Sequence, residues 1–287
     1  MTLHQLPIAN KEKVIIVGAG IGGLAASLRL SHMGYNVKVF ETAQTGGGKL
    51  RTITGQTGEI DIGPTVLTLL PVFQNLFKSV GEDIFEHVEL VRQKIIARHW
   101  WPDGETLDLY DDFETSRDAI LNFSGSDSAK EFEKYFYDTR DLFSCFDIPV
   151  MRNPNPSMLD MNRAVLNNPK ILFKMHPLRT LSSLLNYKFR DSRLQQLFGR
   201  YSTYVGGSPL ESPALLSLIW QAEARGVWSI KGGMKKLARV LEKLANDRGA
   251  SFHYSTEVKE LNIKYDRLVS VKDNLNISHE ADKFIFN

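Results

Sequence analysis

The sequence predicts an α/β protein in which a domain built on a parallel sheet is interrupted by a second, largely helical domain of mixed α/β type. Three observations support this prediction. Residues 14–41 alternate as strand, glycine-rich turn, helix and strand, and a helix with further strands returns near the end. The residues between are rich in aromatic and long apolar side chains. We therefore expect one domain from residues 1–64 and 229–287, and a substrate domain from residues 65–228.

The first segment has the pattern of a βαβ unit. Val14–Val17 is a short apolar strand, and Leu24 and Leu28 mark one face of the helix that follows. Gly34 is placed to end that helix, and Val37–Phe40 forms the next strand. Strands joined in this way lie parallel, with a right-handed crossover.

The later segments are placed by the same reasoning. Apolar residues recur at spacings of three and four from Met234 to Ala245, which predicts an amphipathic helix, and Gly249 follows as its stop. Helices are also expected in the middle of the chain. The expected elements are helices within 129–143 and 179–189, a strand at 252–258, a β-ribbon from 261 to 271, and a last strand at 281–287.

A glycine motif stands between the first strand and the first helix. Gly18, Gly20 and Gly23 have the spacing G-x-G-x-x-G, with Gly22 inside it. The first glycine permits a tight turn, the second allows a pyrophosphate to approach the backbone, and the third lets helix and strand pack closely. The helix N-terminus then offers free N–H groups and partial positive charge to phosphates. The motif predicts a Rossmann-like, dinucleotide-binding domain.

The residues after the second strand favour FAD over a nicotinamide cofactor. Glu41 ends the strand, where its carboxylate can accept hydrogen bonds from ribose hydroxyls and disfavours a 2′-phosphate. A second glycine cluster follows, with Gly47 and Gly48 leading into Lys49 and Arg51. Such a loop is typical of a flavoprotein, in which it approaches the pyrophosphate from the other side and an arginine neutralises it.

The composition is that of an ordinary globular protein, with 43% hydrophobic and 24% charged residues. The net charge of +2 gives no case for nucleic-acid binding. Cys145 is the single cysteine, so no internal disulfide is expected, and a reducing, cytoplasmic compartment is indicated. The seven histidines show no ligand spacing, so no metal is predicted.

No membrane-crossing helix or signal peptide is expected. The uncharged run at residues 14–28 is broken by four glycines and is shorter than the roughly 20 apolar residues of a span. Residues 1–13 lack the apolar core of a signal peptide and are expected to form a tail.

Beyond these patterns, the sequence resembles a known family. VIIVGAGIGGLAASLRLSHMGYNVKVFE followed by GGGKLRT is similar to the flavin-containing amine oxidase and carotenoid desaturase superfamily. EIDIGPTVLT is similar to the bacterial carotenoid (phytoene-type) desaturases. The stretches ARHWWPDGETLDLY, PVMRNPNP and LFGRYSTYVGGSPLESPALLSLIWQAEARGVWSIKGGM most resemble the 1-hydroxycarotenoid 3,4-desaturases, also called hydroxyneurosporene or methoxyneurosporene dehydrogenases.

The resemblance implies site residues and a reaction. It implies that FAD binds the two glycine loops and Glu41, that Gly63, Pro64 and Thr65, next to Asp61, lead toward the flavin ring, and that the backbone of Val258 meets the adenine. It implies FAD-dependent desaturation of a hydroxylated acyclic carotenoid such as 1-hydroxyneurosporene, with hydride passing to the flavin. No catalytic residue is named, because charge beside a polyene is delocalised and the cofactor supplies the chemistry.

The resemblance also implies an extent and partners. Members of the family are nearly twice as long, so this chain corresponds to an N-terminal part and the C-terminal part of the fold is missing. A carotenoid needs a long apolar tunnel, for which Tyr201, Tyr204, Trp220 and Trp228 are candidate linings. It also implies peripheral contact with a membrane.

The candidate membrane surface is the segment 170–190, which mixes leucine and phenylalanine with basic residues. Among these basic residues are Lys174, Arg179, Lys188 and Arg190. A domain helix with a solvated polar face is the alternative for this segment. Homo-oligomerisation is left open.

Other functions remain open from the sequence. One alternative is a phytoene desaturase, a carotenoid isomerase or an amine oxidase of the same superfamily. The other is a non-catalytic fragment that binds a lipid or a partner, because Rab GDP-dissociation inhibitors share the glycine motif without flavin.

Overall fold

The computed structural model describes residues 12–56, 58–153 and 155–287, which form two compact units. Unit 1 runs to Val91 and resumes at Trp228, and unit 2 comprises Arg92–Val227. Residues 1–11, part of the expected tail, lie outside the described residues, and Lys13 already belongs to a strand. Residues 65–91 pack in unit 1 because their apolar side chains complete its core.

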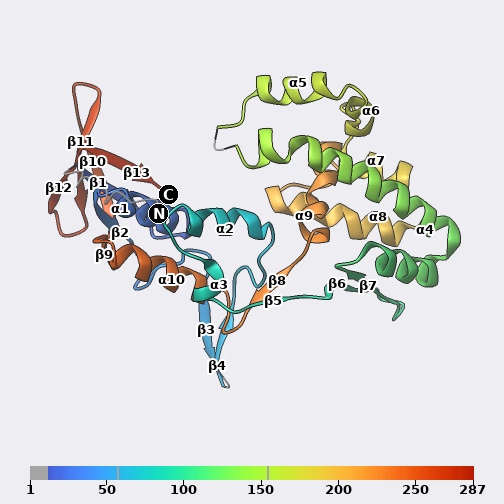
Figure 1. Ribbon diagram of the computed structural model, residues 1–287, viewed down its shortest axis with the longest axis horizontal. Coiled ribbons are helices and arrows are strands. Elements are labelled where there is room, and N and C mark those ends of the chain that lie inside the picture. Colours follow the sequence, from blue (N-terminus) through green and yellow to red (C-terminus); the bar gives the residue numbers. More distant parts are fainter. Residues whose placement is uncertain (1–11, 57, 154) are drawn as a thin grey trace, which may run out of the picture. The chain divides into compact units, whose positions relative to one another are not determined.

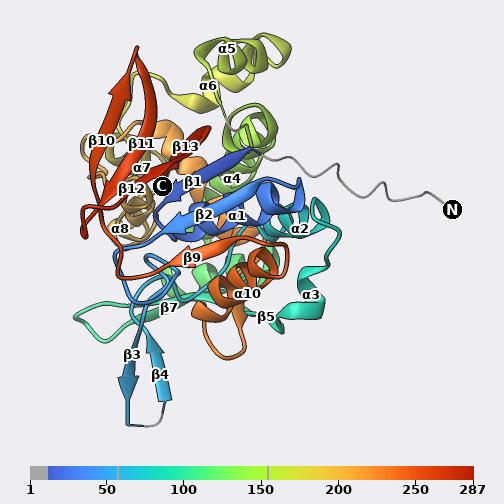
Figure 2. The ribbon, with the colours of Figure 1, turned by 90° about the vertical axis from the view of Figure 1, so that its left-hand side faces the viewer.

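A four-stranded parallel sheet forms the centre of unit 1 (Figure 2). Its order is β13 (Lys283–Phe286), β1 (Lys13–Val17), β2 (Asn36–Phe40) and β9 (Ser251–His253). All three neighbouring pairs are parallel. The predicted α/β class with a parallel sheet is therefore confirmed.

Alternating side chains of the sheet face two different layers. Val14 and Ile16 join the core beneath α1 (Ile21–His32) and α10 (Lys235–Asn246), two helices that pack on each other. Ile15 points the other way and packs with Val271 of the antiparallel sheet described next. The sheet is thus covered by helices on one face and by strands on the other.

The covering sheet consists of β10 (Val258–Lys264), β11 (Arg267–Asp273) and β12 (Ser278–Glu280) (Figure 2). The first two strands form the ribbon expected from the sequence. The third was not predicted. The strand expected at residues 252–258 is interrupted, because Ser255 has a φ of +52° and the chain turns there toward the loop after β2.

The predicted helices of unit 1 form for the expected reasons. α1 ends where expected, and Gly34, with a φ of +87°, follows it. α10 buries Leu237, Leu241 and Leu244 on one face, which is the face predicted by their spacing. The remaining elements of unit 1 are β3 (Thr52–Gly55), β4 (Gly58–Asp61), α2 (Leu70–Lys78), α3 (Ile84–His87), β5 (Leu90–Arg92) and β8 (Trp228–Ile230).

Unit 2 is largely helical around one hairpin. The hairpin is β6 (Ile95–Trp100) with β7 (Thr106–Tyr110), and α4 (Phe113–Phe146) follows it, with a break in helical geometry at Gly125 (Figure 1). The other helices are a π-helical turn (Asp147–Met151), α5 (Met158–Asn167), α6 (Ile171–Met175), α7 (Leu181–Lys188), α8 (Ser192–Gly199), 3-10 turns at Arg200–Val205 and Ala214–Ile219, and α9 (Trp220–Ala224).

The core of unit 2 is aromatic. Phe132 stacks on Phe198 there, and Trp220 meets the Phe198 ring edge to face. The Trp220 ring N–H donates to the Thr139 hydroxyl at 2.8 Å. Tyr201 is fully buried in the same core. Two of the side chains proposed to line a tunnel, Trp220 and Tyr201, are therefore core residues.

The long helix α4 does not change the expectation about membrane crossing. Over the described residues, no helix combines the length and the apolar character that spanning a bilayer requires.

Candidate functional site

The first glycine loop lies at the carboxyl end of β1. Gly18 has a φ of +100°, a left-handed conformation that favours glycine, and its N–H donates to the Phe40 carbonyl. Gly20 is the residue before α1, and Gly22 and Gly23 lie in the first turn of that helix. The helix has no acidic residue in this turn, so the free N–H groups at its N-terminus favour the binding of an anion.

Gly23 fits the packing role that the motif predicts. A Cβ at this position would lie 2.1 Å from the carbonyl oxygen of Gly18, a distance that no side chain tolerates. Only glycine therefore lets α1 start this close to the end of β1.

The second glycine loop lies directly against the first. Gly47 forms a parallel bridge with Gly20 and donates its N–H to the Ala19 carbonyl at 2.8 Å. A Cβ on Gly48 would lie 2.9 Å from the Cα of Gly20. The two loops are separated by more than twenty residues in sequence, and the fold joins them into one glycine-lined surface.

Glu41 lies beside these loops at the end of β2. Its carboxylate accepts hydrogen bonds from the N–H groups of Ala19 and Ala43, at 2.7 and 2.9 Å. Two backbone donors thus fix the carboxylate next to the first loop. This is the edge of the sheet where parallel α/β folds bind nucleotides.

The segment that leads away from the second loop pairs with the segment before residue 65. Lys49 and Arg51 are both exposed, and Arg51 accepts the Ile62 N–H through its carbonyl. A Cβ on Gly63 would lie 1.9 Å from the Lys49 carbonyl oxygen, so this position requires glycine.

Pro64 and Thr65 follow Gly63 and are exposed. Asp61, just before them, accepts the Met234 N–H at 2.8 Å and so anchors the start of α10.

The residues before Val258 run beside the loop after β2. Thr256 donates its N–H to the Glu41 carbonyl, and Ser255 donates to the Ala43 carbonyl. Val258 itself begins β10 and packs partly buried against Ile15 and its neighbours.

The sequence reasoning did not anticipate a role for Asn287. Its N–H donates to the Val17 carbonyl, and its side-chain amide lies 2.7 Å from the place that a Cβ on Gly20 would take. The pairing of β13 with β1 brings this residue to the glycine loops. A prediction that the last strand pairs with the first would have placed Asn287 beside the glycine loops.

These observations fit a dinucleotide. Glycines line the surface where the two loops meet, and the Asn287 side chain lies against it. The N-terminus of α1 points to this surface, and Glu41 lies beside it. The residues present are compatible in charge and space with the pyrophosphate and ribose of such a ligand.

A second polar cluster, in unit 2, was also missed. Glu223 is buried, and its Oε2 accepts from Arg200 at 2.5 Å and from the Tyr201 hydroxyl at 2.8 Å. Its Oε1 accepts from the Tyr204 hydroxyl. Burial, and then the Glu223 carboxylate, raise the pKa of Tyr201, so this hydroxyl remains a donor. Residues 200 to 223 meet only through the fold of unit 2.

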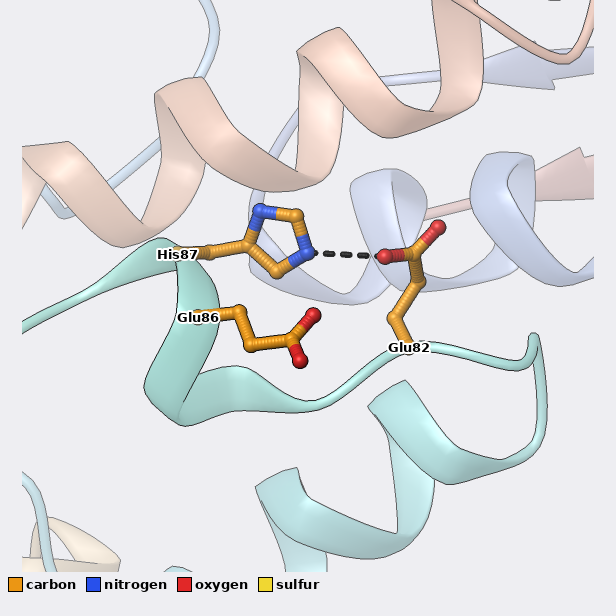
Figure 3. Close-up of side chains that lie close together, drawn as sticks. All are labelled: Glu82, Glu86 and His87. Carbon is orange, nitrogen blue, oxygen red and sulfur yellow. Dashed lines mark hydrogen bonds and ion pairs between the residues drawn. The ribbon is translucent and has the colours of Figure 1, made fainter.

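Three further ionisable groups gather around Glu82 in unit 1 (Figure 3). The Nε2 of His87 lies 2.8 Å from Oε2 of Glu82, and the ligand atoms of both, with one from Glu86, lie within 4.8 Å of one another. Arg248 donates to the other oxygen of Glu82 at 2.6 Å. Hydrogen bonds from Arg248 and His87 lower the pKa of Glu82. The carboxylate is already paired, so the group is a structural ion-pair network.

We expect Arg248→Met to lower the free energy of unfolding by about 2 kcal/mol at pH 7, because hydrogen bonds to a charged group are lost. Arg248 also donates to the carbonyls of Leu244 and Val80, so it joins the end of α10 to the loop after α2. Because the folded-state pKa of Glu82 is lowered, the stabilisation is present above the ordinary value of 4.5 and is lost as the pH falls below it.

Urea unfolding followed by circular dichroism at pH 7 and pH 3 tests this prediction. The control is Arg239→Met, which breaks an exposed pair with Glu59 and should cost less than about 1 kcal/mol at either pH. An equal loss at both pH values for Arg248→Met would contradict the electrostatic part of the prediction.

Comparisons with known proteins agree with this geometry. The family model described as flavin containing amine oxidoreductase matches residues 21–286. The hydroxyneurosporene desaturase of Cereibacter sphaeroides is 42% identical over 275 residues, covering 96% of this chain and 56% of that protein. The hydroxyneurosporene desaturase of Rhodobacter capsulatus is 40% identical over 278 residues, covering 97% of this chain and 56% of that protein. The chain spans about half the length of the curated relatives it matches.

The fold is also found among solved structures. An oxidoreductase from Methanosarcina mazei has a TM-score of 0.66 at 18% identity, covering 96% of this chain and 58% of that one. At this identity the likeness concerns the fold alone. The family match confirms the resemblance drawn from the glycine motifs. It also confirms the flavin cofactor, FAD, that these motifs predict.

Proposed function

The chain belongs to the flavin containing amine oxidoreductase family, and on this premise we propose that it forms part of an FAD-dependent desaturase of a hydroxylated acyclic carotenoid. One observation carries the proposal: 42% identity to a hydroxyneurosporene desaturase extends over 96% of this chain. The meeting of the two glycine loops beside Glu41 supports it, because such an enzyme needs this cofactor surface.

In the proposed reaction, two hydrogens leave adjacent carbons of the substrate, one as a hydride and one as a proton. Bound FAD would supply the hydride acceptor. The chain's own residues hold and orient it. Backbone amides of Gly18 to Gly23 and the N-terminus of α1 would bind the pyrophosphate. The Glu41 carboxylate, held by two backbone donors, would accept a hydrogen bond from a ribose hydroxyl with a remaining lone pair.

The remaining predicted residues complete the proposed site. Gly47 and Gly48 let the second loop approach the pyrophosphate, and Lys49 and Arg51 neutralise it from the exposed side. The segment Gly63, Pro64 and Thr65 leads toward the flavin ring, and the Val258 backbone lies next to the adenine. We assign no residue to proton transfer.

Two measurements test the proposed function. The first is the visible absorption spectrum of the purified 287-residue chain after incubation with FAD and desalting, where retained oxidised-flavin bands support the cofactor site. The second is product analysis with hydroxyneurosporene and with phytoene, in a protein that contains this chain at the length of its relatives. Exclusive conversion of phytoene would replace the proposed function by the phytoene desaturase alternative.

We also propose that unit 2 contacts a membrane surface, from which a water-insoluble carotenoid has to be taken. The apolar side chains of α5, α6 and the turn after α6 support this. Phe173 is 80% exposed and Leu178 is fully exposed, while Leu159 and Leu166 are exposed on α5. Aliphatic and aromatic side chains exposed together are typical of an interfacial surface.

The structure changes which residues of the segment 170–190 are expected to matter. Lys174 and Lys188 both pair with Asp138 of α4, and Arg190 pairs with Asp127 and Glu131. These carboxylates offset the positive charge that the sequence suggested for lipid contact. The segment is also divided into α6 and α7, so it is not one amphipathic helix.

We therefore expect the double variant Phe173→Ser with Leu178→Ser to sediment less with phosphatidylcholine vesicles than the unchanged chain. Arg179→Gln is the control, because it removes an exposed charge next to Leu178 in the sequence and leaves Phe173 and Leu178 unchanged. Sedimentation of the double serine variant at the level of the unchanged chain would remove the membrane proposal.

A further inference from the structure

The side chain of Asn287 lies on the first glycine loop of unit 1. Its Nδ2 is 2.7 Å from the position that a Cβ on Gly20 would take, and its Oδ1 is 2.5 Å from the corresponding position at Gly22. Apart from the adjacent residues and the backbone of α1, no other residue of the described chain comes within 4 Å of these two positions. Asn287 is therefore the side chain that enters the space kept open by these glycines.

Strand pairing, and not a strong side-chain hydrogen bond, brings Asn287 to this place. Its N–H donates to the Val17 carbonyl at 2.9 Å and continues the parallel register in which Val17 lies opposite Phe286. The side chain is exposed, and within the described ranges its one hydrogen bond is from Nδ2 to the Gly18 carbonyl at 3.5 Å. This distance is longer than the usual 2.7–3.2 Å or so. The amide is thus positioned by the backbone, and its own donors are almost unused.

The amide lies beside backbone donors that have no acceptor within the helix. The first hydrogen bond of α1 runs from the Leu24 N–H to the Gly20 carbonyl, so the N–H groups of residues 21–23 precede the helical pattern. Gly20, the residue before the helix, has no side chain that could cap this end, and the first turn carries no acid. Asn287 adds a side-chain donor to this group of backbone donors.

A pyrophosphate matches this set of donors. Its oxygens accept hydrogen bonds, whereas a primary amide carries two N–H donors and no charge. Hydrogen bonds to a charged acceptor are about twice as strong as those between neutral groups. Because the Asn287 side chain is exposed and weakly bonded, it can rotate to make room over Gly20 and keep its donors beside the loop. An aspartate at this position would instead repel the phosphates.

We propose that Asn287 is a further cofactor-binding residue, whose side-chain amide donates a hydrogen bond to the pyrophosphate of FAD beside the N-terminus of α1. This inference rests on the proposed function, because it takes FAD as the ligand of the two glycine loops. It extends the site from the first strand of the parallel sheet to β13, the strand that pairs with it.

The first test is FAD affinity, measured by the quenching of flavin fluorescence in a protein that contains this chain at the length of its relatives. Asn287→Ala removes the amide and should weaken FAD binding about thirtyfold, the loss expected for a hydrogen bond to a charged group. A side chain that only obstructs the loop would have the opposite effect, because its removal would tighten binding. Tighter or unchanged binding would therefore overturn the proposal.

Asn287→Asp keeps the shape of the side chain and replaces its donors by a negative charge. It should bind FAD at least about tenfold more weakly than Asn287→Ala does, because like charges repel at close range. Asn36→Ala and Asn36→Asp are the matched controls, since Asn36 is an exposed asparagine at the amino end of β2 in the same sheet. Both should bind FAD as the unchanged protein does. An equal loss in Asn36→Asp and Asn287→Asp would contradict a local contact.

The second test separates contact with the phosphates from an effect on folding. At least one ³¹P signal of bound FAD should shift in Asn287→Ala, and none should shift in Asn36→Ala. Urea unfolding of the apoprotein should be unchanged by Asn287→Ala, because the side chain is exposed. Weaker binding that comes with easier unfolding and unshifted ³¹P signals would refute the contact.

The outcomes separate the two proposals. Turnover of hydroxyneurosporene with an FAD affinity unchanged by Asn287→Ala leaves the proposed function standing and refutes the role of Asn287. Weaker FAD binding by Asn287→Ala, in a protein that converts no carotenoid, supports the role of Asn287 and refutes the proposed function.

Discussion

Replacing Gly23 by alanine is expected to lower the free energy of unfolding by about 3 kcal/mol and to abolish FAD retention, because an overpacked position displaces backbone. The new methyl would meet the Gly18 carbonyl oxygen at 2.1 Å, and neither group can rotate away. The helix α1 has to move from the end of β1. The glycine loops and the core beneath α1 would both be disturbed.

Gly22→Ala is the matched control, one position earlier in the same helical turn. Its methyl would meet only the Asn287 side-chain oxygen, at 2.5 Å, and that side chain can rotate. Alanine also favours helix over glycine by about 1 kcal/mol. We expect Gly22→Ala to fold normally but to retain less FAD, because its methyl narrows the approach to the pyrophosphate.

Urea unfolding followed by circular dichroism, together with flavin retention, distinguishes the two variants. If both variants unfold at the same urea concentration, the close approach to the Gly18 carbonyl is not the reason that position 23 requires glycine. If Gly22→Ala retains FAD fully, Gly22 does not line the cofactor.

Arg200→Met is expected to destabilise unit 2 by about 3 kcal/mol, because it leaves the Glu223 carboxylate buried without its cation. Glu223 is 6% exposed. The hydroxyls of Tyr201 and Tyr204 would still donate hydrogen bonds to the Glu223 carboxylate, which limits the destabilisation. Methionine keeps the apolar stem of the side chain, which limits the loss of packing.

Tryptophan fluorescence during urea unfolding measures this effect, since Trp100, Trp101 and Trp220 all lie in unit 2. The double variant Arg200→Met with Glu223→Gln should regain part of the stability, because the unpaired charge is removed with its partner. A double variant less stable than Arg200→Met alone would show that packing, and not charge, explains the loss.

Arg179→Met serves as the reference for an exposed arginine of the same unit. Its guanidinium lies 4.5 Å from the centre of the Tyr187 ring, a contact of about 0.5–1 kcal/mol at an exposed site. If Arg179→Met lowers the free energy of unfolding as much as Arg200→Met does, the burial of Glu223 does not explain the effect of Arg200→Met.

The sequence alone determined β1, α1, β2 and α10 of unit 1 and the class of its cofactor. Gly18 and Gly23 could be predicted from the sequence because each meets a constraint set by its immediate neighbours, a left-handed φ at Gly18 and a close approach to the Gly18 carbonyl at Gly23. The buried face of α10 could be predicted for the same reason, because helical spacing alone brings its apolar residues to one side of the helix.

Only the tertiary structure decided which distant segments meet. Gly47 lies against Gly20 because the loop after β2 returns to β1, and Asn287 reaches the same loops because β13 pairs with β1. The segment 170–190 was basic in sequence, yet its lysines face the carboxylates of α4. His99, Arg200 and Glu223 are separated by up to 124 residues and carry no shared spacing. Their cluster exists because burial brings them together, and burial depends on the packing of the whole unit.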